Sequence, residues 1–476
     1  MSRFNTKKVL KSKTTNIAGG SAYKLGSEQE LIHAVLTTFL DDKYYESGVD
    51  RISRIQKLVS QNKPEFVANL AVIARTEFNL RSVSHLLIAE LSKQHKGDDL
   101  IKRAVVASAI RPDDLTEIVS CVGLPIPKQI KRGARNALLK FDRYQLAKYK
   151  GEGNSLSLVD LFNLVHPKVQ HANKEQKKAW KDLIKGDLKS FDTWETELSN
   201  AKNDTARTKI LNKLITENKL GYMALIRNIN NFIKYNISAT AKKAVINKLT
   251  SKTEVYKSRQ LPFRFVTAFN NVKGNVSYSD AISEAMDIAV DNVPTLEGKT
   301  LIAIDSSSSM MGSGFGRDEE SGAIYKASIF GATLLKANKD ADVILYDERV
   351  KTLAISSRPP VIDLANSIVK EANGGGTNTS LVFHFAEQSK TKYSRIIIIS
   401  DNESWQTNAQ TAYNAYKTKT GNNPFVYAID IQGYGTTDVK GGKVFNLSGW
   451  SDRLLDFIGQ AEKGETLIDY IKNYTI

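Results

Sequence analysis

Hydrophobic residues recur at a helical spacing through roughly the first 290 residues of this chain. Leu31 and Val35 lie four residues apart, Ile52, Ile55 and Leu58 follow at steps of three, and similar stretches continue toward Val290. This spacing places the apolar side chains on one face of a helix. Many modest helices with short connections predict stacked helical pairs. No strict period is visible, so any repeats are degenerate, and one globular helical domain is the alternative.

The pattern changes after Pro294, where short apolar runs begin to alternate with helical segments. The runs expected to form strands are Thr300–Ile304, Asp342–Tyr346, Arg395–Ser400, Pro424–Ile431 and Lys443–Leu447. Strands separated by helices in this way predict a doubly wound parallel sheet. We therefore expect an irregular basic arm over residues 1–25, a helical domain over 26–293 and a sheet domain over 299–476.

Oxygen-bearing side chains follow the first of these strands. The sequence LIAIDSSSSM places Asp305, Ser307 and Ser309 in a polar loop directly after Ile304. One carboxylate and two hydroxyls are hard ligands that suit Mg²⁺. Ligand sites of open α/β sheets lie at this end of the strands. A serine-rich turn without a ligand is the alternative for this stretch alone.

Two later stretches favour the metal interpretation. The loop Gly374-Gly375-Gly376 ends in Thr377, and the apolar run at 396–399 ends in Ser400-Asp401. In this order the three elements resemble the metal-ion-dependent adhesion site of von Willebrand factor A domains. The resemblance implies a divalent ion with an open position for an acidic group of a partner. It implies these direct or water-mediated ligands: Asp305, Ser307, Ser309, Thr377 and Asp401. Relatives often carry Gly at the position of Ser308.

The net charge of +16 is unevenly distributed. Residues 1–300 contain 49 Lys and Arg against 31 Asp and Glu, whereas residues 301–476 contain 18 against 20. A basic first part suggests an acidic polymer as its partner, although a merely solvated basic surface is the alternative. The single cysteine, Cys121, excludes an internal disulfide. With no signal peptide and no apolar run of about 20 residues, we expect a soluble, cytoplasmic, monomeric protein without a membrane partner.

Basic residues gather on one predicted helix after Pro127. Four of them are spaced i, i+3, i+4 and i+7 and therefore share a face, which would hold phosphates by charge-assisted hydrogen bonds. Tyr149 and His166, in later basic stretches, would stack on unpaired bases. A solvated helix face and a structural His are the alternatives. The candidate RNA-binding residues are Lys128, Lys131, Arg132, Arg135, Lys148, Tyr149, Lys150, His166 and Lys168.

Several stretches together resemble the TROVE family, named for telomerase, Ro and vault components, and its Ro branch in particular. They are ARTEFNLR (74–81), KYK (148–150), DLFNLVHPK (160–168), GYMALIRN (221–228), SRQLP (258–262), DSSSSM (305–310) and SDNES (400–404). They occur in family order over nearly the full chain.

The resemblance implies a ring of HEAT-like repeats, an α-solenoid, closed by a von Willebrand factor A domain. Family members bind small noncoding Y RNAs on the basic outer surface and single-stranded 3′ ends of misfolded RNAs in the central hole. Lys148 and His166 match family positions implicated in RNA binding. Where relatives carry another basic residue after KYK, this chain has Gly151-Glu152-Gly153. An acidic group there would repel phosphate and weaken part of the outer site.

The sequence contains no phosphate-binding GxxxxGK[ST] motif, no HExxH motif and no Cys/His cluster. We therefore expect an RNA-binding ribonucleoprotein component, not an enzyme. The alternative is a Mg²⁺-dependent adhesion scaffold whose basic part binds an acidic protein, with an exoribonuclease or another protein at the metal site. A Mg²⁺-dependent nuclease that uses Asp401 and Glu403 is a third hypothesis, and the scarcity of carboxylates argues against it.

Overall fold

The computed structural model describes most of the chain. The described residues are 13–37, 48–151, 155–189, 194–272, 274–311, 322–338, 340–406, 408–449, 454–455, 458, 462 and 466–476. They form two compact units. The sheet unit comprises Met1–Lys24 and Thr193–Gly464, and the helical unit comprises Leu25–Asp192 and Glu465–Ile476. Among the described helices, none has the length and apolar character needed to span a bilayer.

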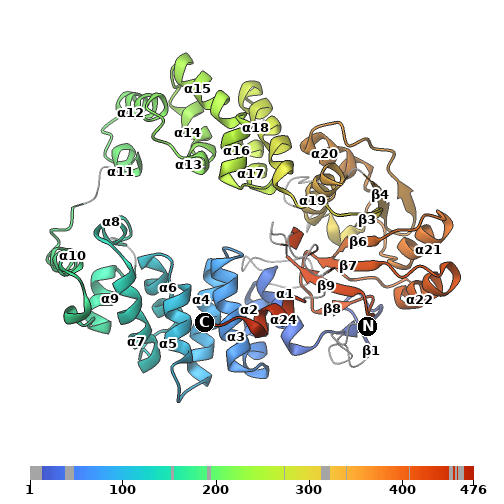
Figure 1. The fold of residues 1–476 in the computed structure, drawn as a ribbon, viewed down its shortest axis with the longest axis horizontal. Coiled ribbons are helices and arrows are strands. Elements are labelled where there is room, and N and C mark those ends of the chain that lie inside the picture. The colour runs from blue at the N-terminus through green and yellow to red at the C-terminus, as the bar shows by residue number, and fades with distance from the viewer. Residues whose placement is uncertain are drawn as a thin grey trace. The chain divides into compact units, whose positions relative to one another are not determined.

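The helical unit is built from packed helix pairs (Figure 1). Helices α3 and α4 pack together, as do α4 with α6 and α5 with α7, which is the arrangement of stacked helical pairs that the sequence predicts. Proline begins α3 and α6, where its missing N–H leaves no helical hydrogen bond unmade. The helices are α1 (Ser27–Leu36), α2 (Gly48–Gln61), α3 (Pro64–Thr76), α4 (Arg81–Gln94), α5 (Leu100–Ser108), α6 (Pro112–Val122), α7 (Lys128–Ala137), α8 (Arg143–Lys148), α9 (Leu158–Val165), α10 (Lys174–Lys185) and α24 (Leu467–Asn473). The 3₁₀ turns are η1 (Leu138–Lys140) and η2 (Val169–His171).

One buried carboxylate joins the helices of this unit. Asp114 on α6 is fully buried and accepts hydrogen bonds from Arg75 on α3 (2.9 and 3.1 Å) and from Arg81 on α4 (2.9 Å). It also accepts the backbone N–H groups of Ile110 and Arg111, each at 2.9 Å. Five hydrogen bonds from four donor groups to one carboxylate make it an electrostatic centre of the stack.

The longer segment of the sheet unit, Thr193–Gly464, begins with a second run of helices. They are α11 (Trp194–Ser199), α12 (Asp204–Thr216), α13 (Tyr222–Arg227), α14 (Ile229–Lys234), α15 (Ala239–Leu249), α16 (Lys252–Ser258), α17 (Phe263–Val272) and α18 (Val276–Ala289), followed by the 3₁₀ turn η3 (Val290–Asn292). Serine and asparagine side chains at the helix starts, such as Asn203 and Ser238, accept N–H groups that would otherwise be unpaired.

A six-stranded sheet follows, with strand order β5-β4-β3-β6-β7-β9. All neighbours are parallel except the edge strand β5, which pairs antiparallel with β4. The strands are β3 (Thr300–Asp305), β4 (Ala341–Tyr346), β5 (Val350–Thr352), β6 (Arg395–Ser400), β7 (Phe425–Asp430) and β9 (Val444–Ser448). The predicted doubly wound sheet is confirmed, with one antiparallel edge strand added.

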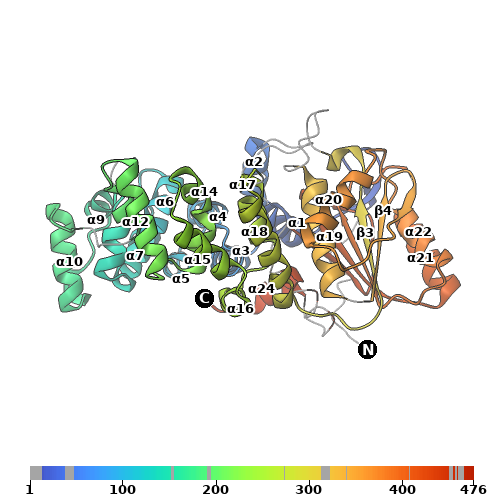
Figure 2. The same ribbon diagram turned by 90° about the horizontal axis from the view of Figure 1, so that it is seen from above.

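Helices cover both faces of this sheet (Figure 2). Helices α19 (Ala323–Ala337) and α20 (Val361–Glu371) lie on one face, and α21 (Ser380–Gln388) and α22 (Ala409–Thr420) lie on the other. Every residue of β3 and β6 is buried, which explains why these strands read as continuous apolar runs. From β3 the chain first adds strands β4 and β5 on one side and then adds β6, β7 and β9 on the other, so the strand order switches between β3 and β6. Ligands of open α/β sheets bind at such a switch point, and the carboxyl ends of β3 and β6 carry the predicted metal loops.

The two ends of the chain differ from the sequence prediction. Within the expected irregular arm, β1 (Lys13–Thr15) and β2 (Ser21–Lys24) form a hairpin whose second strand pairs with β8 (Thr436–Thr437). Residues 1–12 lie outside the described part. Helix α24, expected in the sheet domain, belongs to the helical unit, where Asn69 donates to the carbonyls of Ile471 and Tyr474 at 2.9 and 2.8 Å. These pairings connect residues hundreds of positions apart, so local patterns carry no sign of them.

Candidate functional site

The predicted metal loop is a tight turn at the carboxyl end of β3. The backbone N–H of Ser307 donates to Asp305 Oδ1 at 2.8 Å, and the hydroxyls of Ser307 and Ser309 lie 3.2 Å apart. All three side chains are buried or nearly so. The turn therefore places one carboxylate and two hydroxyls side by side, as the sequence predicts.

Backbone hydrogen bonds bring the glycine loop against this turn. Ser307 forms a parallel bridge with Gly375, and the N–H of Ser308 donates to the Gly375 carbonyl at 2.9 Å. The Gly374 N–H donates to the Ser306 carbonyl at 3.0 Å. A side chain on Gly376 would collide with Trp405, so glycine is needed where this loop passes the next one.

The loop after β6 completes the arrangement. The Ser400 hydroxyl donates to Asp305 Oδ2 at 2.6 Å, which ties the ends of β3 and β6 together. The N–H of Trp405 donates to the Thr377 carbonyl at 3.2 Å. The structure therefore brings together all three elements that carry Asp305, Ser307, Ser309, Thr377 and Asp401.

The two carboxylates of this site are electrostatically strained. Burial raises the pKa of Asp305 and of Asp401, and the proximity of the two like charges raises the pKa of Asp401 further. Asp401 Oδ2 is buried without a hydrogen-bond partner. In the described part of the chain, neither carboxylate forms an ion pair with Lys or Arg. A bound divalent cation would relieve both costs, so these residues fit the metal.

The donor set defines which metal would suit the site. Among the described residues, no group of three or more His, Cys, Asp and Glu side chains is arranged to hold a metal. Binding here would therefore depend on the hydroxyls of Ser307, Ser309 and Thr377 and on water, in addition to two carboxylates. Such an all-oxygen set suits Mg²⁺ and disfavours softer ions such as Zn²⁺.

Two further acids lie beside the metal loops: Glu403, named in the sequence only for the nuclease hypothesis, and Asp438, which was not predicted as a site residue. Burial raises the pKa of Glu403 to about 8 and that of Asp438 to about 7. Glu403 accepts the N–H of Ala18 at 3.0 Å, and Asp438 accepts the Thr379 hydroxyl at 2.7 Å. Glu403 stands in the SDNES stretch, but only the tertiary structure shows that Asp438 lies close by.

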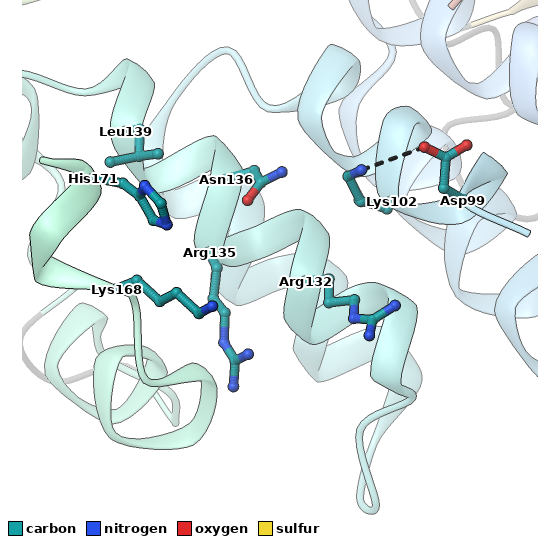
Figure 3. A pocket seen from close by; sticks show the side chains of 8 residues that line it. All are labelled: Asp99, Lys102, Arg132, Arg135, Asn136, Leu139, Lys168 and His171. Atoms are coloured by element: carbon teal, nitrogen blue, oxygen red, sulfur yellow. Dashed lines mark hydrogen bonds and ion pairs between the residues drawn. The ribbon is translucent and has the colours of Figure 1, made fainter.

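The helical unit contains a basic cleft of about 380 Å³ (Figure 3). Arg132 and Arg135 enter it from α7, and Lys168 enters from the segment between α9 and η2. The full lining is Asp99, Lys102, Arg132, Arg135, Asn136, Leu139, Lys168 and His171. Residues from three separate elements therefore line one concave surface.

The cations of the cleft differ in how firmly they are held. The Arg135 Nε–H donates to the carbonyl of Val165, which fixes the guanidinium between α7 and the end of α9. Lys102 pairs with Asp99 at 3.3 Å, which partly neutralises it. Within the described chain, Arg132 and Lys168 are exposed and form no ion pair. Their charge is available to a phosphate.

The remaining predicted RNA-binding residues lie around the cleft or apart from it. Lys128 and Lys131 share α7 with Arg132 but do not line the cleft. His166 is exposed and ends α9 in a left-handed conformation. The Tyr149 ring of the KYK stretch already makes a cation–π contact, because the Arg111 guanidinium lies 5.0 Å from its centre. Lys148 Nζ lies 5.9 Å from the same ring.

Part of the site could not be found from the sequence. Lys102, Asn136, Leu139 and His171 line the cleft without belonging to any basic stretch singled out in the sequence. Asn136 and Leu139 continue the face of α7 at i+4 and i+7 from Arg132, which is the one local signal for them. Glu152 and Gly153, where the sequence departs from the family, lie outside the described residues.

Two family models match the chain. The TROVE domain matches residues 185–277, and the Ro60 von Willebrand factor A domain matches residues 299–460. The crystal structure of the Ro protein (RSR) of Deinococcus radiodurans superimposes with a TM-score of 0.63 at 18% identity, covering 89% of this chain and 96% of that one. This likeness confirms the fold of a helical first part followed by an A domain.

Curated relatives match over part of their length. The RNA-binding protein RO60 of Deinococcus radiodurans is 25% identical over 230 residues, 44% of this chain and 43% of the relative. Telomerase protein component 1 of Rattus norvegicus is 21% identical over 295 residues, 44% of this chain and 11% of the relative. The chain thus spans less than half the length of each. With both family models matching in order, the chain carries a TROVE domain followed by a Ro60-type von Willebrand factor A domain, and the predicted resemblance to the TROVE family is confirmed.

Proposed function

We propose that this protein is a Ro-like RNA-binding protein that holds small structured noncoding RNA on the basic surface of its helical unit. The observation that carries this proposal is the basic cleft, which is lined by Arg132 and Arg135 of α7 and by Lys168 of the segment between α9 and η2. Cationic side chains that lie close together without acidic partners repel one another, and a bound polyanion would offset this repulsion. Arg135 is fixed in advance by Val165, so little side-chain entropy is lost on binding.

The resemblance refines the proposal. A relative bears the name RNA-binding protein RO60. The family resemblance alone implies Y RNAs and the single-stranded 3′ ends of misfolded RNAs as ligands. We assign a Y-like RNA to the basic cleft and its surroundings. The 3′-end site in a central hole rests on the family resemblance alone. In this proposal the protein is a scaffold or quality-control factor for RNA and not an enzyme.

Salt dependence tests the RNA proposal directly. The logarithm of the binding constant for a small structured RNA should fall linearly with the logarithm of the salt concentration. Each phosphate contact should contribute about 0.7 to 0.9 to the slope of this line. The double variant Arg132→Ala with Lys168→Ala removes two such contacts and should reduce this slope by roughly 1.4 to 1.8. A matched control is Lys177→Ala with Lys181→Ala, two exposed lysines on α10.

The outcome is read by fluorescence anisotropy of labelled RNA. Charge reversal of Lys131, Arg132 and Arg135 to Glu should abolish binding at physiological salt. If the unmodified protein ignores structured RNA even in dilute buffer, the proposal is wrong. If the α10 control lowers the slope as much as the cleft variant, the binding surface lies elsewhere.

A second candidate function concerns the A domain. Among the described residues, Asp401 Oδ2 has no hydrogen-bond partner, and burial together with the nearby Asp305 carboxylate raises the pKa of Asp401. This observation favours a Mg²⁺-dependent adhesion site that captures an acidic group of a partner protein, for example an exoribonuclease. When bound, the ion would supply an open coordination position, while the serine hydroxyls and Thr377 orient its other ligands.

Calorimetry with Mg²⁺ alone tests this site without any partner. The expected binding heat should vanish in Asp305→Ala and persist in the RNA-cleft variants. Unchanged heat in Asp305→Ala would contradict the assignment. The same variant separates the nuclease hypothesis, since RNA shortening that stops in Asp305→Ala would indicate catalysis.

A further inference from the structure

The basic cleft contains groups that a phosphate does not require. Asn136 and Leu139, on one face of α7 and η1, line it together with His171 of η2. In Figure 3 the His171 ring lies beside Leu139, and the Asn136 side chain extends from α7 away from the Arg135 guanidinium. These three side chains offer amide, ring and apolar contacts that suit a base, in addition to the phosphate contacts that the cations offer.

The chemistry of the lining divides into two parts. Lys102, Arg132, Arg135 and Lys168 can only donate hydrogen bonds, which suits phosphate oxygens. The Asn136 amide can both donate and accept. It is exposed, and within the described chain it has no hydrogen-bond partner. A primary amide is the group that pairs with the N6 and N7 atoms of adenine in two parallel hydrogen bonds.

The cleft is also of suitable size and shape for a single nucleotide. Its volume of about 380 Å³ lies near the lower end of the roughly 300 to 1,000 Å³ that small-molecule sites occupy. The His171 ring and the Leu139 methyl groups offer flat and apolar contacts of the kind that hold an unstacked base. The guanidinium of Arg135, fixed by Val165, stands where the attached phosphate would be held.

We propose that this cleft binds one unstacked adenine nucleotide of the RNA, with its phosphate at Arg135 and Lys168 and its base against His171 and Leu139, read by Asn136. The inference rests on the proposed RNA-binding function and adds a base preference to it. Phosphate contacts fix the position of the RNA, and the amide supplies the sequence information. A bulged nucleotide is the natural ligand, because it is already unpaired and costs less to extrude.

The experiment uses the full chain and four RNA hairpins that differ only in one bulged nucleotide, A, C, G or U. Dissociation constants are measured by fluorescence anisotropy at one fixed salt concentration. The adenine bulge should bind about 5- to 150-fold more tightly than the others. Asn136→Ala should remove this difference and leave the three weaker RNAs unchanged. Arg132→Ala should weaken all four equally, and Asn163→Ala, an exposed asparagine on α9, should change nothing.

The possible results separate the base site from RNA binding in general. If the protein binds all four hairpins equally, the adenine site is refuted while the proposed function stands. The adenine site is likewise refuted if another base is preferred or if Asn136→Ala weakens all four hairpins equally. If none of the hairpins binds, both the site and the proposed function fail. Because Asn136 is exposed, its truncation should leave the melting temperature unchanged, and circular dichroism checks this.

Discussion

Replacing Asp114 by Asn should destabilise the helical unit more than any neighbouring charge change. The carboxylate is fully buried and accepts five hydrogen bonds, two of them from Arg75, which is itself only 7% exposed. An asparagine keeps the shape but removes the charge and turns a donor toward other donors. Removing one partner of a buried ion pair costs about 3 to 5 kcal/mol, because the remaining charge is left uncompensated.

Hydrogen exchange measures this loss where it occurs. The backbone amides of α3, α4 and α6 exchange through local opening of the stack, so their rates follow its local stability. A loss of about 3 to 5 kcal/mol corresponds to rates roughly 150- to 5,000-fold higher in Asp114→Asn. Mass spectrometry of peptides that cover the three helices gives these rates one helix at a time.

Asp113 provides a demanding control. It precedes Asp114 on α6 and pairs with the same Arg81 at 2.8 Å, but its side chain is 22% exposed. Partly solvated pairs contribute about 1 kcal/mol or less, so Asp113→Asn should raise exchange by no more than about tenfold. If the two variants exchange alike, burial of the charge does not determine the stability of this stack, and the argument is refuted.

Three further predictions concern the metal site, the N-terminal hairpin and acid stability. Asp401→Asn should raise the melting temperature of the metal-free protein while abolishing the Mg²⁺ heat, because it removes a buried like charge; a lower melting temperature would contradict this reasoning. Gly20→Ala should release the hairpin, since the new Cβ would lie 1.9 Å from the Ser404 carbonyl oxygen. Limited proteolysis within residues 13–24 should therefore become faster. Gly221→Ala is the control and should not change this rate, because a Cβ there meets nothing within 4 Å. Burial raises the pKa of Glu117, but bonds from neighbouring His and Ser side chains outweigh it and hold this pKa at about 2. Stability from Glu117 is therefore present above its ordinary value of 4.5 and lost as the pH falls toward 2; acid unfolding should become less steep in Glu117→Gln, and an unchanged profile would rule the effect out.

The metal loops illustrate how far local pattern reaches. The apolar runs before Asp305 and Asp401 are buried strands, as expected, because a strand covered on both faces must be apolar throughout. Parallel neighbours then bring their carboxyl ends to one edge, so two residues 96 positions apart meet by topology alone. The resemblance supplied the glycine loop and Thr377, whose approach depends on backbone bonds that no sequence spacing reveals.

The basic cleft illustrates the opposite case. Helical periodicity placed Arg132 and Arg135 on one face of α7, but it could not show that Lys168 and His171 come to the same concave surface. The position of Tyr149 in a basic stretch also suggested that its ring was available for stacking, whereas in the structure the Arg111 guanidinium already lies over this ring.

The sequence by itself determined the helix-to-sheet order, the turn that carries Asp305, Ser307 and Ser309, and the basic face of α7, because each depends on residues close together in the chain. Only the tertiary structure decided that the N-terminal hairpin joins the sheet unit, that α24 packs with the helical unit, and that Asn136 lines the same cleft as Lys168. Those contacts come from packing between segments that are distant in the sequence. Their free energy depends on the fit and burial of the packed surfaces, so they produce no periodic pattern in the sequence.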